Sequence, residues 1–496
     1  MNVAKLFSSN MLGLVLAIGI TLLITYRPGA TYEADAFIMG RRLITGLTEL
    51  MHRAMLMIFI PVMAAGLVAG GARQAGLARR AWRTLAAGGA MFAAIWLITP
   101  PVIDALGGVM AVKTRELAIW VTRAMALAIP AVVLANLLTA TLNLRGVFGA
   151  PALLRLLPRL FIIAAFFLAA SGVLVKSAAA AFVLGNLALM LGCLWLVRRS
   201  RAAPSPQSAS ASTSRPRPPG QVGAVLLMVG GAQVVSLIEI GFAVRLGEGA
   251  LTILELSQRI TMLISGAFIL ATVMPFLARW SRDEDARSPA SFGRALRMGL
   301  VFLACVQGFF LINAGAVVTL LFGHSLLEPA ALRELVALVV VAAVAPLVVY
   351  WYQLLATWNI AAGGAGLVVC VLAATAANLS VRVALALGLM PQIGLQALAL
   401  GMAAGPGIAA LVLTVFGDRG FRPVTPHGWR GAARPTAAVV LVLAALALGH
   451  LAGQTYGGGL GPVAAATMTM AASALTGTVA VAILVRRFGL LGMLRQ

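Results

Sequence analysis

Cysteine is scarce in this sequence, which holds three cysteines among 496 residues. Cys193, Cys305 and Cys370 lie far apart, each within a strongly apolar segment. Metal sites need ligands at short repeated spacings, and extracellular disulfides need pairs outside the membrane. The pattern argues against both, so we expect the three thiols to pack as small apolar side chains. No metal site, cofactor or catalytic residue is predicted.

Charge is scarce as well, at 10% of the residues, whereas 61% are hydrophobic and the mean hydropathy is +1.00. A soluble domain has no use for so much apolar surface. Windows of about 20 apolar residues, enough to cross the hydrocarbon of a bilayer, recur along nearly the whole chain. We therefore predict an all-α polytopic membrane protein with about 14 transmembrane helices.

Acidic residues are few, 14 against 37 Lys and Arg, which gives a formal net charge of +23. Such a charge could indicate a nucleic-acid partner, but most arginines fall in alternate connections between spans. This positive-inside pattern reports topology, predicts that both termini face the cytoplasm, and leaves no reason to expect nucleic acid. The chain also lacks a GxxxxGK[ST] loop, so it has no nucleotide-hydrolysing site of that kind.

One low-complexity stretch, rich in Ser, Pro and Arg, interrupts the apolar pattern between Arg198 and Gln221. Such composition is typical of a flexible cytoplasmic linker. We predict four parts: an N-terminal lobe (1–198), the linker (199–220), a C-terminal lobe (221–420), and two extra transmembrane helices with a cytoplasmic tail (421–496).

The two lobes share an internal repeat. Pro130 and Asn143 recur as Pro346 and Asn359, both 216 residues further on, and Arg42 recurs as Arg259 with a shift of 217. We predict two six-helix lobes in a pseudo-twofold arrangement plus the two C-terminal helices. In repeat-built transporters the substrate site lies between the halves near the bilayer midplane.

The segment EADAFIMGRRLITGLTELMHRA, residues 33–54, places many charges in a predicted membrane helix. At helical spacing, Arg42, Thr45, Glu49 and either His52 or Arg53 share one face. A charge at the bilayer centre costs about 2.5–3.5 kcal/mol, so this face must line a water-filled cavity or find partners within the protein. The plain alternatives are that Glu49 and Arg53 form a purely structural ion pair, and that His52 is a polar residue of the cavity wall whose hydrogen bonds are satisfied within the protein.

The second half repeats this theme with Glu255 and Arg259, one helical turn apart, and with Glu239 in the preceding segment. Arginine remains charged in a poor dielectric and can bind phosphate bidentately, so we expect an anionic substrate. The alternative is that the arginines only neutralise the acids. The candidate substrate-binding residues are Arg259, Arg42, Arg53, Arg41 and Arg123. The candidates for charge pairing or ion coupling are Asp35, Glu49, His52, Glu239 and Glu255.

At these residues the chain resembles the MurJ/MviN lipid II flippases, within the larger multidrug/oligosaccharidyl-lipid/polysaccharide exporter superfamily. The resemblance begins at Ala34-Asp35-Ala36-Phe37 and Arg42 and continues through ATLNLRGVFGAPALLRLLP. It is clearest in GAQVVSLIEIGFAVRLGEGALTILELSQRITMLISGAFILATVMPFLAR, where Arg259 takes the place of a central-cavity arginine of the family.

The resemblance implies a two-lobed transporter whose cationic central cavity holds the diphosphate-sugar head group of an undecaprenyl-linked precursor. The last two helices would form a groove for its polyprenyl tail. Some family features differ. The first helix, NMLGLVLAIGITLLITY, has none of the family's arginines, and the family's second-helix arginine pair falls near Thr48 and Glu49. Arg53, near a family glutamate, could stand in for that pair.

The predicted function is therefore a flippase in the bacterial inner membrane. It would move an undecaprenyl-diphosphate-linked glycan precursor, lipid II or similar, to the outer leaflet by alternating access for peptidoglycan and cell-wall biosynthesis. A flippase for exopolysaccharide or O-antigen units is the first alternative. A cation-coupled drug exporter, a membrane-embedded glycan enzyme and a non-transporting scaffold are weaker ones, and the short outer connections disfavour the enzyme. We expect a monomer in contact with membrane lipids, with cell-envelope synthesis enzymes as further partners.

Overall fold

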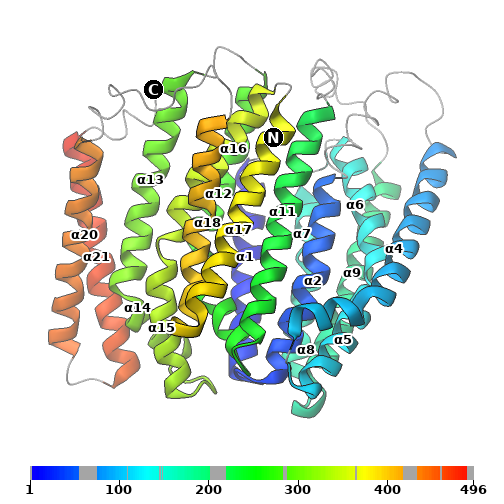
Figure 1. The fold of residues 1–496 in the computed structure, drawn as a ribbon, viewed down its shortest axis with the longest axis horizontal. Helices are drawn as coiled ribbons and strands as arrows, with labels where there is room; N and C mark the ends of the chain where they lie inside the picture. The colour runs from blue at the N-terminus through cyan, green and yellow to red at the C-terminus, as the bar shows by residue number, and fades with distance from the viewer. Residues whose placement is uncertain are drawn as a thin grey trace. The chain divides into compact units, whose positions relative to one another are not determined.

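The computed structural model describes residues 3–54, 75–108, 110–144, 147, 149–200, 219–282, 288–363, 366–416, 433–457 and 461–488. These residues form helices joined by short turns (Figure 1). Most of the predicted linker and residues 55–74 and 417–432 lie outside the described residues. Two compact units are present, Met1–Thr252 and Ile253–Gln496. The lobe boundaries predicted from the repeat stay a prediction.

The first unit holds nine α-helices among its described residues. They are α1 (Val3–Tyr26), α2 (Tyr32–Ala54), α4 (Ala75–Gly107), α5 (Val112–Ala126), α6 (Ile129–Leu144), α7 (Gly149–Leu154), α8 (Leu157–Leu168), α9 (Leu174–Arg199) and α11 (Pro219–Val244).

The second unit contains most of α12, which begins just before the boundary, and all later helices. They are α12 (Ala250–Arg282), α13 (Pro289–Ile312), α14 (Ala314–Phe322), α15 (Pro329–Ala342), α16 (Ala345–Ala362), α17 (Leu367–Ile393), α18 (Leu395–Phe416), α20 (Ala433–Gly457) and α21 (Pro462–Phe488).

The predicted all-α polytopic fold is confirmed. Within the described residues, 11 helices are long and apolar enough to cross a membrane, and Val15–Tyr26 is a shorter apolar helix. The charged helices α2 and α12 complete the series. When the interrupted pairs α5–α6, α7–α8, α13–α14 and α15–α16 each count as one crossing, the total is about fourteen, as predicted.

Two of these interruptions lie at the repeated prolines. The helix breaks at Leu127–Ala128 before Pro130, and again at Ala343–Val344 before Pro346. Proline has no N–H to donate and its ring clashes with the carbonyl four residues earlier, so the helical ladder must open there. The Leu127 and Ala128 amides instead bond carbonyls three residues back, at 3.3 and 3.0 Å. The backbone thus reproduces the sequence repeat at the predicted offset.

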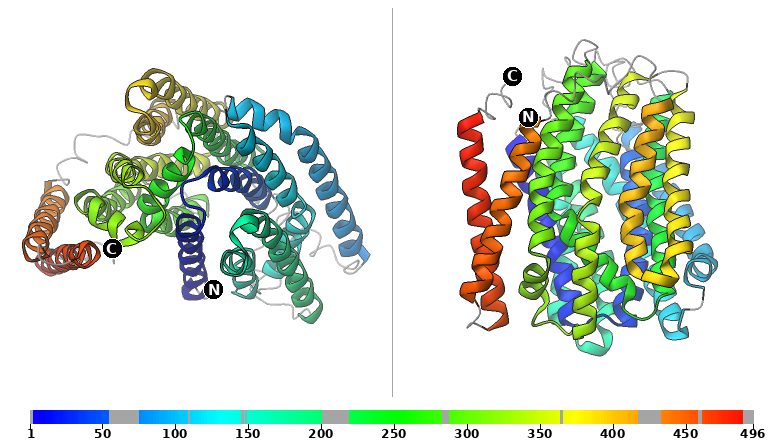
Figure 2. Two further views of the ribbon diagram at one scale, coloured as in Figure 1. Left: turned by 90° about the horizontal axis from the view of Figure 1, so that it is seen from below. Right: turned by 60° about the vertical axis from the view of Figure 1, so that its left-hand side comes forward.

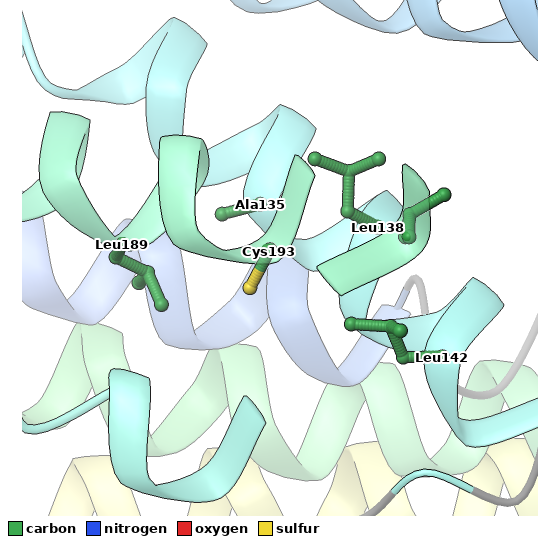
Figure 3. Close-up of a cluster of buried hydrophobic side chains, with 6 residues drawn as sticks. Ala135, Leu138, Leu142, Leu189 and Cys193 are labelled. Atoms are coloured by element: carbon green, nitrogen blue, oxygen red, sulfur yellow. The ribbon is translucent and has the colours of Figure 1, made fainter. Parts of the chain in front are cut away.

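Helix α6 packs along α9 in the first unit (Figure 3). Ala135, Leu138 and Leu142 of α6 meet Leu189 and Cys193 of α9 in a buried apolar cluster. The Cys193 thiol is fully buried there, with its sulfur 3.7 Å from the Thr139 hydroxyl. The cysteine therefore serves as a small packing residue, as its apolar surroundings in the sequence indicated.

In the second unit, α20 and α21 form a close hairpin (Figure 2). Gly449 and Gly453, four residues apart on α20, face the backbone of α21 so closely that neither position has room for a Cβ atom. Small residues at this spacing let membrane helices approach each other through their backbones. The hairpin also packs on α13 and α14, where the helix break places the buried Asn313.

Asn313 links three elements of the second unit. Its side-chain nitrogen donates to the Ser473 hydroxyl of α21 at 2.9 Å, and its side-chain oxygen lies 2.9 Å from Nδ1 of His450 on α20. The Ser473 hydroxyl donates in turn to the Leu446 carbonyl at 3.0 Å. Polar bonds therefore hold the C-terminal hairpin to the broken helix α13–α14.

Candidate functional site

The charged helix α2 begins at a reciprocal pair of acidic caps. The Asp35 carboxylate, 2% exposed, accepts hydrogen bonds from the Gly249 amide at 2.7 Å and from the Thr252 amide and hydroxyl at 2.9 and 2.7 Å. In the other direction, the Glu248 carboxylate accepts from the Tyr32 amide at 2.8 Å. Asp35 of α2 therefore accepts from backbone amides at the start of α12, and Glu248, just before α12, accepts from the first amide of α2. The helix dipole also favours negative charge at both of these helix starts.

Gly249 makes this joint possible. Its φ of +83° is strained for any residue with a side chain. A Cβ atom there would lie 2.6 Å from the Ala30 carbonyl oxygen, in the connection between α1 and α2. The close approach of the two connections brings Asp35 to the start of α12. For Asp35 the geometry indicates a capping role, and its part in ion coupling stays a proposal.

Arg41 and Arg42 are adjacent but point to different surroundings. Arg41 is buried, 8% exposed, with its guanidinium 5.8 Å from the ring centre of Phe37. Arg42 is half-buried and its Nη1 lies 3.3 Å from the Ser236 hydroxyl of α11. Because α2 packs on α11, Arg42 has a polar neighbour inside the first unit. Glu239, also on α11, is buried at 7% exposure.

The predicted polar face of α2 is only partly described. Thr45 and Glu49 are exposed on it, as a cavity-lining face requires. The side chains of His52 and Arg53 lie outside the described residues, so the predicted pairing of Glu49 with Arg53 stays a prediction. Glu49 does have an electrostatic neighbour in Arg155, just after α7.

Arg123 lies against α4. Its Nε donates to the Trp96 carbonyl at 3.1 Å, and its guanidinium sits 5.1 Å from the centre of the Trp96 indole. Pro100 follows four residues after Trp96 within α4, and it cannot give that carbonyl the usual helical hydrogen bond. Arg123 therefore replaces a backbone donor that proline does not supply. Its role as a substrate-binding residue stays a proposal.

Glu255 and Arg259 form an ion pair along α12, with Nε of Arg259 2.8 Å from the Glu255 carboxylate. The two side chains differ sharply in burial, at 1% exposed for Glu255 and 40% for Arg259. The buried acid holds Nε of the guanidinium, while the arginine side chain stays 40% exposed. This arrangement can present a bidentate donor to an anion.

Sequence reasoning missed three groups that shape these surroundings: Glu248, Ser236 and Arg155. Glu248 and Ser236 are isolated polar residues, and neither belongs to a motif or a periodic pattern that would mark it in the sequence. Arg155 falls in ATLNLRGVFGAPALLRLLP, a segment that carried the family resemblance without marking any residue of a site. In the structure its guanidinium reaches α6, where Nη2 lies 3.4 Å from the Asn136 side-chain oxygen.

Comparison with known proteins decides the family. Residues 24–459 match the model of the family described as Lipid II flippase MurJ. The chain belongs to this family. The resemblance predicted from the sequence is thereby confirmed, and the protein is a multi-pass membrane protein of the MurJ family. No curated protein matches the chain at a significant level of sequence similarity.

Solved structures agree on the fold. A structure of lipid II flippase MurJ in an inward closed conformation has a TM-score of 0.77 at 13% identity, covering 97% of this chain and 99% of its own. An inward-facing multidrug resistance MATE family transporter of the MOP superfamily reaches 0.62 at 18% identity, covering 82% and 93%. A MOP superfamily transporter from Pyrococcus furiosus reaches 0.59 at 18% identity, covering 83% and 94%. At these identities the likeness shows a shared fold.

Proposed function

We propose that this MurJ-family protein moves an undecaprenyl-diphosphate-linked glycan precursor, with lipid II as the first cargo, from the inner to the outer leaflet. The observation that carries the proposal is the Glu255–Arg259 pair: a half-exposed arginine within a membrane helix, fixed by a buried carboxylate. A charge within a membrane-spanning helix is costly unless it lines a polar path or is paired. Guanidinium is the side chain suited to a diphosphate.

The physical task favours such a site. The diphosphate-sugar head group loses its hydration in hydrocarbon at great cost, whereas the polyprenyl tail is stable there. A flippase therefore needs to shelter only the head group. Arg42 and Arg41 on α2, with Arg53 beyond them, would supply further positive charge in the first unit. In this proposal the protein is a transporter and not an enzyme, it works by alternating access, and both of its termini face the cytoplasm of a bacterial inner membrane.

A second cargo class has one observation in its favour. From Asn10 to Tyr26, α1 carries no charged residue, whereas the resemblance leads us to expect arginines in this helix. A relative that carries exopolysaccharide or O-antigen units would share the diphosphate but differ in the sugar. An uncharged α1 would then suit a different sugar, and Arg259 would keep its role.

A genetic experiment tests the proposal. A bacterium depleted of its own lipid II flippase receives this chain, either as wild type or as Arg259→Ala, with membrane levels of each measured. We expect the wild type to restore growth and Arg259→Ala, at equal level, to fail. Arg333→Ala serves as a matched control, because it removes an arginine from the same unit near the start of α15. Failure of a correctly inserted wild type would reject lipid II as cargo and direct the next test to exopolysaccharide or O-antigen precursors.

A further inference from the structure

The interior of the first unit contains a polar group whose hydrogen bonds are incomplete. Asn136 lies on α6 and is 6% exposed. Its side-chain oxygen accepts from Arg155, but its side-chain nitrogen is fully buried and, within the described residues, donates to nothing. Buried amide donors in native proteins are almost always partnered. The Asn136 nitrogen therefore indicates an acceptor that is not part of the described chain.

Arg155 gives this place a positive charge. It follows α7 directly, with its amide 3.2 Å from the Pro151 carbonyl, so the short helix fixes where the residue starts. From there the half-buried side chain reaches α6, and Glu49 of α2 and Cys193 of α9 are its electrostatic neighbours. The guanidinium thus contacts α6 and has ionisable groups of α2 and α9 in its electrostatic surroundings, within a unit that spans the membrane. A charge in such a position is by default a candidate for function.

The next hydroxyl along α6 is already engaged. The Thr139 hydroxyl, one turn along α6 from Asn136, pairs with the Cys193 sulfur. The Asn136 amide nitrogen is the group left without an acceptor, and the Arg155 guanidinium lies beside it, with Nη2 3.4 Å from the Asn136 oxygen. Both are donors only, and one carries a full charge. An anionic oxygen, such as that of a phosphate, matches this combination better than a cation, an amine or an apolar group.

We propose that Arg155 and Asn136 form a phosphate-binding site within the first unit that contacts the diphosphate of the cargo. The proposal rests on the proposed function and adds to it a residue pair from the turn after α7 and from α6. Glu49 balances the charge of Arg155 when no cargo is bound, and the incoming phosphate takes over that place. The site would thereby supply positive charge that α1 lacks.

Purified protein in lipid nanodiscs tests the site directly, with inorganic pyrophosphate as the probe and isothermal titration as the measurement. The variants are Arg155→Gln and Asn136→Asp. Arg199→Gln is the matched control, because it removes one positive charge from an exposed position in the same unit. We expect Arg155→Gln to weaken binding about 10- to 100-fold, as loss of a charge-assisted hydrogen bond implies, and the control to leave it unchanged.

Asn136→Asp keeps the experiment decisive if Arg155→Gln fails to fold. The new carboxylate has the shape of the amide and can still bond Arg155, so the melting temperature should hold while pyrophosphate binding falls. If Asn136→Asp binds pyrophosphate as tightly as the wild type, water satisfies the amide nitrogen and the proposal is overturned.

The same variants in the depletion strain separate the two proposals. If the wild type rescues growth and Arg155→Gln at equal level does not, both stand. If the wild type and Arg155→Gln rescue growth equally and bind pyrophosphate equally, the phosphate site is rejected and the flippase function stands. If the wild type fails to rescue but binds pyrophosphate in an Arg155-dependent way, the site stands and lipid II is rejected as cargo.

Discussion

Helices α2 and α12 hold matching places in the sequence repeat, yet they stabilise their charges differently. On α12 the partner of Arg259 is Glu255 of the same helix, one turn earlier and buried. On α2 the neighbours described for Arg42 and Glu49 come from other elements, Ser236 of α11 and Arg155 after α7. The arginine of α12 is therefore held by its own helix, whereas the contacts described for Arg42 and Glu49 of α2 depend on how that helix is packed.

The largest effect is expected on α12, from Glu255→Leu. Removing a buried carboxylate leaves Arg259 without the group that fixes its Nε. We expect unfolding free energy to fall by about 2–3 kcal/mol, below the usual loss for a buried pair because Arg259 is half-exposed. Thermal unfolding of the purified protein measures this.

The double variant Glu255→Leu/Arg259→Leu provides the control. It should regain most of the lost stability and still fail to support growth in the depletion strain. If Glu255→Leu alone is as stable as the wild type, water solvates Arg259 without help from Glu255. The contrast between an arginine held by its own helix on α12 and charges that contact other elements on α2 then disappears.

An intermediate effect is expected at the start of the two helices. Asp35→Asn removes the charge and one of two accepting oxygens from the cap of α12, which should cost about 1–2 kcal/mol. Hydrogen exchange at Gly249 and Thr252 should become faster. Glu248→Gln, at an exposed position on the opposite cap, should cost only about 0.3–1 kcal/mol. If exchange at Tyr32 in Glu248→Gln becomes faster by as much as exchange at Gly249 and Thr252 in Asp35→Asn, the two caps are equivalent.

The smallest effect is expected from Ser236→Ala on α11. The bond from Arg42 to this hydroxyl is 3.3 Å long and half-buried, so its loss should change stability by about 0.5–1 kcal/mol. We expect the variant to support growth nearly as well as the wild type. A complete loss of growth would mean that Ser236 positions Arg42 for transport, and α2 would then rely on its neighbour as strictly as α12 relies on Glu255.

The backbone was largely predictable from the sequence because lipid allows few solutions. Apolar windows predicted the helices. Pro130 and Pro346 were recognised only as marks of the repeat, and the helix breaks before them are a finding of the structure that follows from the effect of proline in any helix. The predicted cysteine packing at Cys193 followed from its apolar neighbours.

The surroundings of individual charges were not predictable. Arg123 was a candidate for substrate binding, but its observed contact is the carbonyl freed by Pro100, a contact between residues 27 positions apart. Likewise Asp35 meets Gly249 and Thr252 more than 200 residues away. Helical periodicity relates residues within one turn or two of each other and carries no information about such tertiary pairings.

The bonds around Asn313 bear on how the chain can be shortened. A truncated protein that ended before α20 would lose His450 and Ser473 together and leave a buried amide facing hydrocarbon tails. The cost of such exposure is several kcal/mol. The C-terminal hairpin is therefore a required wall of the second unit, and fusion partners for imaging or crystallisation belong after Phe488 and not in its place.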